Sequence, residues 1–438
     1  MDSTLKEKSI KSLLFQYIYP SLIGMVISGI YTTIDGIFIG QGIGSTALAA
    51  INIAFPPVMI IFAFIVMISM GGSIMMSQSL GKGNKSEGEK YLGTSIYLLL
   101  IFSIICPLVA IFLGEKLLIL CGADNTTLKP ALAYFNVRMI FVIFESFATS
   151  FNSFVRNDGN PNLVKKAMAI GAICNIILDA VFIFIFKAGV GGAAIATVIS
   201  QAIVAIMFLK YFLSNESNLK IIKKHITYSK TRIKEICSTG ISSFGTNASY
   251  ALMIIIHNIM LLQYGTVTDV SAYGILIYIY WIFLLIYNGV GQGVQPIISY
   301  NYGANLPNRV KETIKLSSIF TIMVGILSCI LILINPKFII SIFNSEPEVV
   351  SATRTALYYY LIVVLVNGFN LLTAIYFQSI NKLKLASILT FSRTVFFILP
   401  FIFILPKFLG TTGIWISVPI SETLCAIWGG ILIFKSLR

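Results

Sequence analysis

The sequence predicts an all-α integral membrane protein, with twelve transmembrane helices in two homologous six-helix lobes. Three observations support this fold class: an extreme composition, twelve long apolar segments and an internal repeat. Of the 438 residues, 57% are hydrophobic and only 11% are charged, whereas a soluble domain carries about 25% charged residues. The apolar runs are continuous rather than alternating, which favours membrane helices over a β-barrel.

The twelve spans follow from apolar runs that are about as long as the roughly 20 residues a helix needs to cross a bilayer. Their predicted bounds are 12–38, 50–79, 91–113, 131–155, 163–186, 190–212, 236–262, 270–299, 312–334, 355–380, 385–405 and 411–434. The most polar segment, SNESNLKIIKKHITYSKTRIKE, lies between the sixth and seventh spans. We therefore expect an N-terminal lobe at 1–213, a cytoplasmic linker at 214–235 and a C-terminal lobe at 236–438.

The basic residues predict how the spans are oriented. Of the 31 Lys and Arg residues, 23 fall on one side of the predicted topology and 6 on the other, while Arg138 and Arg393 lie within spans. Basic residues in short loops mark the cytoplasmic side, so both termini are predicted to be cytoplasmic. The net charge of +14 is then explained by topology. We expect the lipid bilayer as a partner and no nucleic acid.

Two alignments indicate that the halves are homologous. MGGSIMMSQSLGKGNKSEGEKYLGTSI at 70–96 aligns with QGVQPIISYNYGANLPNRVKETIKLSS at 292–318, at an offset of 222 residues. GAAIATVISQ at 192–201 aligns with GIWISVPISE at 413–422, at an offset of 221. Six spans return the chain to its starting side, so the lobes form a parallel repeat with a pseudo-twofold axis along the membrane normal. Some secondary transporters have this plan, with a substrate site between the lobes and alternating access by rocking.

Four acidic residues lie inside the predicted spans, away from their ends: Asp35, Glu145, Asp179 and Glu422. Charges within a membrane are costly and usually functional. Asp35 is the one ionised side chain between Ser12 and Met70, and it is predicted to bind an ion or a proton unless it lies at the interface. Asp179 follows Asn175 by four residues, which places both on one helical face. Their oxygens suit a hard cation, a shared proton or a structural hydrogen bond.

The remaining charged or titratable residues of the spans each have a structural alternative. Glu145 lies seven residues after Arg138, so the two can form an ion pair. Glu422 can be neutralised by Arg393 from the preceding span. His257 is either sensitive to protons or a packing histidine held by a hydrogen bond.

Signals of enzymatic chemistry are weak. GKGNKS at 81–86 has Asn84 where the Walker pattern requires Gly. The six cysteines are scattered and form no metal-binding motif. We therefore expect no cofactor and a secondary active transporter rather than an enzyme. Aromatic residues, 13% of the chain, suit a cleft that accepts flat organic cations by stacking and cation–π contacts.

Several motifs, in their order and spacing, resemble the multidrug and toxin extrusion (MATE) family and, more narrowly, its bacterial MepA-like branch. They are Pro20, Asp35 and Gly40 at P-x(14)-D-x(4)-G in the first span, SQSLGKGN after the second, RNDGNPNLVKKAM after the fourth, NIILDAVFIF in the fifth and GAAIATVISQ in the sixth. The resemblance covers essentially the whole chain, both halves included.

This resemblance implies a V-shaped, monomeric protein of the bacterial inner membrane that exports cationic amphipathic drugs in exchange for inward H⁺ or Na⁺. It implies an ion-coupling site, which is also the Na⁺ site if Na⁺ is used, at Asp35, Asn175, Asp179 and Thr197. It implies a substrate cleft to which we assign Asn152, Glu145 and Tyr31. Other family members carry a Glu in span seven and an Asp in span ten, and this chain has neither. Coupling is therefore predicted in the first lobe, and any second-lobe role would fall to His257, Glu422 and Arg393.

Two alternatives come from other functional classes. A flippase of lipid-linked precursors, within the same broad superfamily, is expected to have a more cationic cavity that holds pyrophosphate. The spans contain four acidic residues against two arginines, which favours cationic cargo. A sensor or a channel without coupled transport is the third class, and the internal repeat argues against it.

Overall fold

The computed structural model of the protein describes residues 2–344 and 346–437, and over these residues it is helical, without strands. Residues 1 and 438, the outer bounds of the two predicted lobes, lie outside the described part. The helices of the first half are α1 (Asp2–Glu7), α2 (Ile10–Gly42), α3 (Ser45–Gly81), α4 (Lys85–Leu120), α5 (Leu128–Ile140), α6 (Val142–Asn157), α7 (Pro161–Ala180), the π-helix η1 (Val181–Ile185) and α8 (Gly189–Leu213).

The second half begins with a 3₁₀ turn, η2 (Lys223–His225), in the segment between the lobes. Its helices are α9 (Lys230–Tyr264), α10 (Val267–Gly303), α11 (Pro307–Ile334), α12 (Pro336–Ser341), α13 (Pro347–Ser379), α14 (Leu383–Ser392), the π-helix η3 (Arg393–Ile398), α15 (Leu399–Ile404), α16 (Pro406–Leu409) and α17 (Thr411–Leu437). Helix α9 thus begins inside the segment predicted as a linker.

Among the described residues, eleven helical segments are long and apolar enough to cross a membrane, and a bent pair makes twelve when it is counted as one span. The predicted fold class is therefore confirmed. One predicted span needs correction: 131–155 is not a continuous helix, because α5 and α6 meet at Phe141 with a bend of 57°. A salt bridge between Arg138 and Glu145 spans this bend and stabilises it.

The internal repeat reappears in the helix bounds. Helix α3, Ser45–Gly81, recurs as α10, Val267–Gly303, so both of its ends are displaced by 222 residues. The ends of α2 and α9, at Gly42 and Tyr264, are displaced by the same number. Sequence alignment and helix geometry therefore agree on the register of the repeat.

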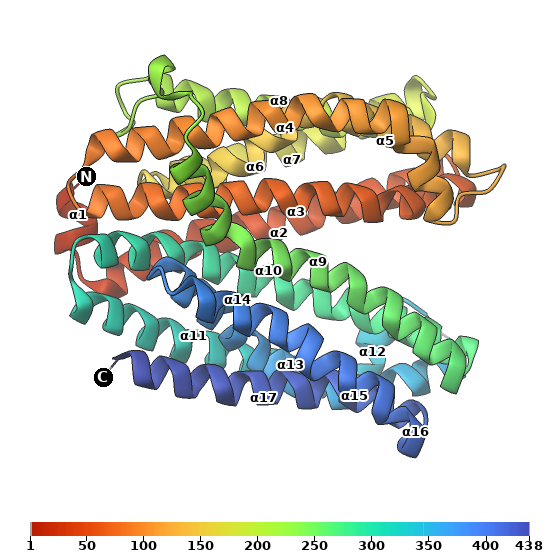
Figure 1. Cartoon of the computed structure of the whole chain (residues 1–438). Coiled ribbons are helices and arrows are strands. Elements are labelled where there is room, and N and C mark those ends of the chain that lie inside the picture. Colours follow the sequence, from red (N-terminus) through yellow and green to blue (C-terminus); the bar gives the residue numbers. More distant parts are fainter. Residues whose placement is uncertain (1, 345, 438) are drawn as a thin grey trace.

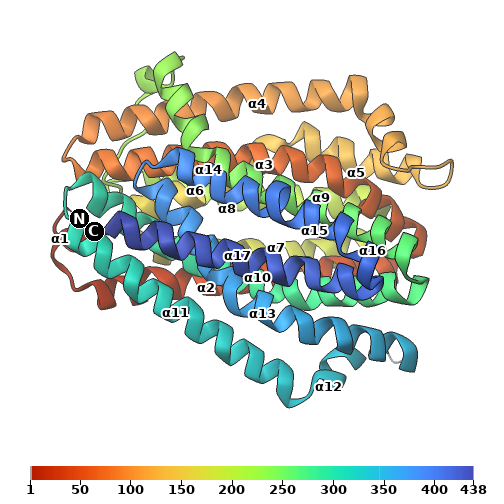
Figure 2. The same ribbon diagram turned by 60° about the horizontal axis from the view of Figure 1, so that its bottom comes forward.

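The two lobes lie side by side, with both termini at the same end of the bundle, which we call the terminal end (Figures 1 and 2). Helices α2 to α8 form one lobe and α9 to α17 the other. The lobes meet where α3 packs against α9, α2 against α10, and α3 against α10. In Figure 1 they are closest near the terminal end and diverge toward the opposite end.

Glycines allow this close approach of the lobes. A Cβ atom placed on Gly81 would overlap the carbonyl oxygen of Tyr300, and one on Gly303 would overlap the carbonyl oxygen of Gln78. Gly81 and Gly303 are equivalent positions of the repeat, so this backbone contact between α3 and α10 lies at the pseudo-twofold axis. Near the terminal end, therefore, a larger residue at either position would push the lobes apart.

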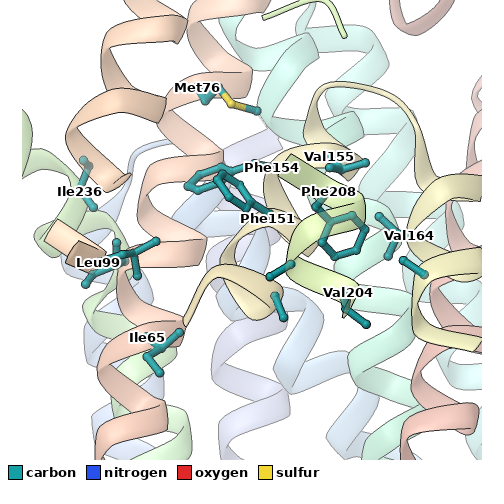
Figure 3. Close-up of a cluster of buried hydrophobic side chains, with 14 of the residues drawn as sticks. Ile65, Met76, Leu99, Phe151, Phe154, Val155, Val164, Val204, Phe208 and Ile236 are labelled. Carbon is teal, nitrogen blue, oxygen red and sulfur yellow. The ribbon is translucent and has the colours of Figure 1, made fainter. Parts of the chain in front are cut away.

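The first lobe encloses an aromatic core (Figure 3). Phe151 and Phe154 of α6 lie with their ring centroids 6.0 Å apart. Phe208 of α8 and Leu99 of α4 are buried in the same core. Ile236 of α9 is also a member, although it belongs to the second half of the chain. The first turns of α9 are therefore fixed to the first lobe.

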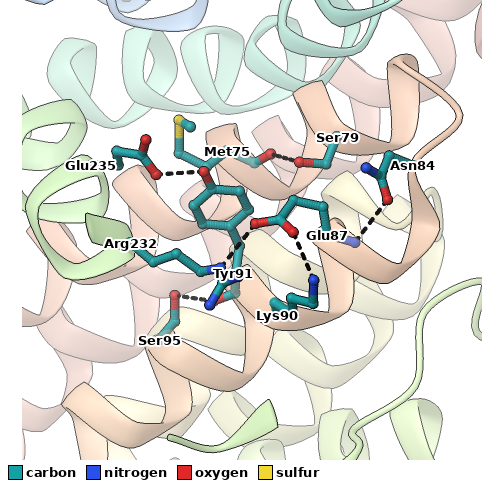
Figure 4. A network of polar contacts seen from close by, with 9 residues as sticks. All are labelled: Met75, Ser79, Asn84, Glu87, Lys90, Tyr91, Ser95, Arg232 and Glu235. Atoms are coloured by element: carbon teal, nitrogen blue, oxygen red, sulfur yellow. Dashed lines mark hydrogen bonds and ion pairs between the residues drawn. The ribbon is translucent and has the colours of Figure 1, made fainter. Parts of the chain in front are cut away.

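A polar network also fixes the first turns of α9 to the first lobe (Figure 4). Arg232 of α9 donates to Glu87 of α4 over 2.9 Å, and Lys90 donates to the other oxygen of Glu87 over 3.1 Å. The Tyr91 hydroxyl donates to Glu235 over 2.5 Å. Such half-exposed ion pairs each contribute roughly 0–1 kcal/mol, so the network mainly sets the position of α9.

Asp158, just after α6, anchors the segment between the lobes. Its buried carboxylate accepts hydrogen bonds from the backbone N–H groups of Asn218 and Leu219, over 2.8 and 3.1 Å, and from the Tyr211 hydroxyl over 2.7 Å. Burial raises the pKa of Asp158 from its ordinary 3.8 to about 6, although these hydrogen bonds act to lower the pKa. The folded protein therefore holds a proton here more tightly than the unfolded chain does.

This difference predicts a pH dependence of stability. Because the pKa is raised on folding, the intact protein should lose stability relative to Asp158→Asn as the pH rises from about 4 to about 6, and the difference should stay constant above that. The size of the change should be about 2–3 kcal/mol. Thermal unfolding midpoints of both purified proteins across this range would measure it, and a difference that does not vary with pH would contradict the assignment.

Candidate functional site

The first lobe contains a set of buried oxygens that lack hydrogen bonds. Asn175 and Asp179, on α7, are only 2% and 0% exposed. Both carboxylate oxygens of Asp179, both polar atoms of the Asn175 side chain and one oxygen of Asp35 on α2 have no hydrogen-bond partner among the described residues. Buried polar groups are almost always hydrogen-bonded, so these oxygens are available for a proton or a bound cation.

These residues lie on helices that pack against each other. Helix α7 lies against both α2 and α8, and the Asp35 carboxylate is close enough to act electrostatically on Asp179. Helix α7 also changes into the π-helix η1 only two residues after Asp179. Short π-helical turns inside α-helices are frequent at functional sites. Asp35 and Asp179 therefore interact electrostatically.

Thr197 of α8 supplies a further oxygen. Its side chain is buried, and its hydroxyl donates to the carbonyl oxygen of Ala193 over 3.1 Å. This bond uses the hydroxyl hydrogen and leaves the lone pairs of the oxygen available. Carboxylate, amide and hydroxyl oxygens are the ligands that a hard cation prefers. Asp35, Asn175, Asp179 and Thr197 thus carry the types of oxygen that Na⁺ prefers, and the two carboxylates can also take up H⁺; their joint role as an ion site stays a prediction.

An ion pair lies close to this set. Nη2 of Arg138 is 2.7 Å from both oxygens of Glu145, and Nη1 of Arg138 donates to the Tyr134 hydroxyl over 3.0 Å. Arg138 is also close enough to act electrostatically on Asp35 and on Tyr31. Of the two alternatives for Glu145, the structure thus forms the ion pair. Glu145 is thus neutralised by Arg138, and its assignment to the substrate cleft stays a prediction.

Asn152, which is predicted to line the substrate cleft, contacts residues near the interface between the lobes. Its Nδ2 lies 3.3 Å from the Met168 sulfur, and its Oδ1 accepts a hydrogen bond from Arg156. Arg156 is only 2% exposed and donates to the backbone oxygen of Gln292, in the other lobe, over 3.2 Å. The contacts of Asn152 therefore connect it to the interface between the lobes rather than to Asp35.

Arg156 and its neighbour Asn157 are interface residues that the sequence analysis did not identify. Asn157 and Gln295, from opposite lobes, exchange two hydrogen bonds of 2.9 and 3.1 Å between their side-chain amides. From sequence alone, Arg156 is expected to be a loop charge, because it directly follows an apolar segment. The sequence carries no signal that the end of this helix is covered by α10.

In the second lobe, the three residues considered for a functional role have structural partners. His257 is fully buried, with Nδ1 2.9 Å from the Met253 carbonyl oxygen and its ring stacked on Tyr273 at 4.8 Å. These contacts match the packing alternative. Glu422 is buried and lies 3.4 Å from Nε of Arg393. No group of three or more His, Cys, Asp or Glu side chains in the described part of the chain could hold a metal ion.

The chain was compared with known proteins. The MatE family model matches residues 20–181 and 243–404, one match in each lobe. The multidrug export protein MepA of Staphylococcus haemolyticus is 27% identical over 99% of this chain and 95% of its own length. MepA of Staphylococcus saprophyticus is 28% identical over 98% of this chain and 94% of its own length.

Solved structures share the same fold. A multidrug resistance MATE family transporter, solved in an outward-facing conformation, superposes with a TM-score of 0.92 at 22% identity and covers 99% of this chain and 98% of its own. A transporter of the MOP superfamily from Pyrococcus furiosus, described as having a binding pocket of reverse polarity, superposes with a TM-score of 0.93 at 22% identity, with coverage of 99% and 97%. At this level of identity, the likeness concerns the fold.

Proposed function

Because this chain belongs to the MatE family, we propose that it is a multidrug transporter, not an enzyme, that exports organic cations in exchange for H⁺ or Na⁺. The observation that carries the proposal is the set of buried oxygens without hydrogen bonds on Asp35, Asn175 and Asp179. The names of the staphylococcal relatives support the multidrug substrate class. The protein works as a monomer in the bacterial inner membrane, with both termini in the cytoplasm, and needs no cofactor.

The proposed cycle depends on the difference in ion binding between two arrangements of the lobes. In the arrangement described here, glycine contacts and the Asn157–Gln295 pair hold the lobes together at the terminal end. The opposite end is then the accessible one, and it faces outward. Uptake of H⁺ by Asp35 and Asp179, or of Na⁺ with Asn175 and Thr197, removes the repulsion between two nearby carboxylates. Helix α2 can then repack, release the cationic substrate and favour the inward-facing arrangement.

The charges inside the lobes support cationic cargo. Glu145 and Glu422 each lie beside an arginine, so of the four acids inside the predicted spans Asp35 and Asp179 are the two without an arginine partner in the described structure. One observation favours the flippase alternative: Arg156 is buried between the lobes without a carboxylate partner among the described residues. A single arginine at the closed end is a weak basis for holding pyrophosphate, whereas two unpaired carboxylates suit a cation.

Transport by the purified protein in proteoliposomes tests the proposal. A pH gradient and a Na⁺ gradient are imposed in separate experiments. We expect at least one of them to drive efflux of tetraphenylphosphonium, and we expect no efflux without a gradient. Whichever gradient drives efflux identifies the coupling ion. Absence of efflux under both gradients, combined with transbilayer movement of a lipid-linked pyrophosphate, would replace the proposal with the flippase function.

A further inference from the structure

A polar cavity lies in the second lobe, beside the interface between the lobes. Its volume is about 110 Å³, which is room for several water molecules. Most of its wall comes from α9, α10, α13 and α14, while Val66 and Met70 of α3 contribute from the first lobe. The cavity is large enough for the polar head of an organic cation.

Amide oxygens without partners line this cavity. The side-chain nitrogens of Asn247 and Asn288 donate to the backbone oxygens of Ser243 and Leu284, one helical turn earlier, over 2.9 and 2.8 Å. Their amide oxygens have no partner within the described structure. The same is true of the side-chain oxygen of Asn370, a residue of the wall that is only 8% exposed. The cavity thus presents hydrogen-bond acceptors that need N–H donors.

A buried carboxylate lies behind this wall. Nδ2 of Asn370 donates to Glu422 over 2.7 Å and fixes its orientation. Nε of Arg393 lies 3.4 Å from the other oxygen of Glu422. This contact is longer than the 2.7–2.9 Å typical of a charge-assisted hydrogen bond, and the Arg138–Glu145 pair is held by two contacts of 2.7 Å. Glu422 is therefore paired only loosely.

Arg393 is in a position to move. Its side chain is 19% exposed and lines the cavity, whereas the Glu422 side chain is 3% exposed. Arg393 is also the first residue of the π-helix η3, a kind of turn that is frequent at functional sites. Arg393 thus contacts both the cavity and the carboxylate, and its displacement away from Glu422 would free that carboxylate for another cation.

The first lobe has no equivalent of this cavity lining. At the repeat offset of 222, Asn288 corresponds to Val66, and Asn370 corresponds to Ala148. The position equivalent to Arg393 is Gly171. The repeated fold therefore accommodates apolar or small residues at all three places. The amides and the arginine of the second lobe are not required by the architecture, which points to a binding role.

We propose that this cavity binds the ammonium or amidinium head of a cationic substrate, which pairs with Glu422 in competition with Arg393. The amide oxygens of Asn247, Asn288 and Asn370 accept the N–H groups of the bound head. Arg393 acts as a resident cation that keeps Glu422 neutralised when no substrate is present. This site extends the proposed export function, on which it rests, by defining a subsite for cations that carry N–H donors.

The competition predicts binding effects of opposite sign. Binding of the fluorescent aromatic diamidine DAPI to the purified full-length protein should weaken about tenfold in Glu422→Gln and tighten by a similar factor in Arg393→Gln. The double variant should behave like Glu422→Gln, because removing Arg393 helps binding only when the Glu422 carboxylate is present to pair with the substrate. Equal losses in both single variants, or no change in either, would mean that the pair is only structural and would overturn the proposal.

A second variant avoids the ion pair altogether. Asn288→Val introduces the residue that the repeat already has at the equivalent position, Val66, so the fold should accept it. It should weaken DAPI binding, yet leave binding of tetraphenylphosphonium unchanged, since that cation has no N–H group. Equal effects on both probes, or none on DAPI, would contradict a hydrogen-bonding subsite.

The proposed export function can be judged separately with the intact protein. If gradient-driven efflux of tetraphenylphosphonium fails in proteoliposomes, the export function is wrong. If that efflux is normal and the DAPI affinities of the variants do not change, only the second-lobe subsite is wrong.

Discussion

Replacement of Asp35 by Asn is expected to reduce gradient-driven export by about 10- to 100-fold, because a coupling free energy of 1–3 kcal/mol is lost. The amide has the same shape as the carboxylate but can neither take up a proton near neutral pH nor carry the charge that attracts Na⁺. Asp35 has a buried oxygen without a partner in the described structure, so the substitution breaks no hydrogen bond of that oxygen. The initial rate of efflux from proteoliposomes would measure the loss.

Two matched variants sharpen this test. Asp179→Asn should reproduce the loss, since its carboxylate shares the electrostatic environment of Asp35. Glu115→Gln makes the same chemical change on α4, where the side chain is exposed, and should export like the parent. An Asp35→Asn protein that exports normally under both a pH and a Na⁺ gradient would show that the coupling role assigned to Asp35 is wrong.

The second large effect is expected at the contact between α3 and α10. Gly81→Val should abolish export, because its side chain would overlap the backbone oxygen of Tyr300 and keep the lobes from closing at the terminal end. A backbone atom cannot move aside as a flexible side chain can. Spin labels at Ser86 and Asn308, exposed equivalents of the repeat, should lie farther apart in the variant than in the parent.

A matched glycine provides the control for steric bulk. At Gly274, on α10, a Cβ atom would meet no other atom within 4 Å. Gly274→Val should therefore leave both export and the distance between the labels unchanged. Normal export by Gly81→Val, with no change in that distance, would contradict the view that this glycine contact holds the lobes closed.

The residues of the candidate site could be predicted from sequence. Which of their charged groups have a partner could not. Asp35 and Asp179 stand out because a charge inside an apolar segment is costly wherever the segment lies. The interface role of Arg156 was missed, because only the packing of α6 against the other lobe buries it. The bend at Phe141 was missed as well, since no Pro or Gly marks it.

Properties that depend on neighbouring residues or on simple counts could therefore be predicted from the sequence. The length of the apolar runs, the bias of basic residues and the offset of the repeat each depend on residues near in sequence or on simple counts, and they defined the fold class. Only the tertiary structure decided that Glu145 is neutralised by Arg138 while Asp179 keeps two oxygens free. Such pairing depends on which helix faces meet and at what distance, and helices far apart in sequence determine it together.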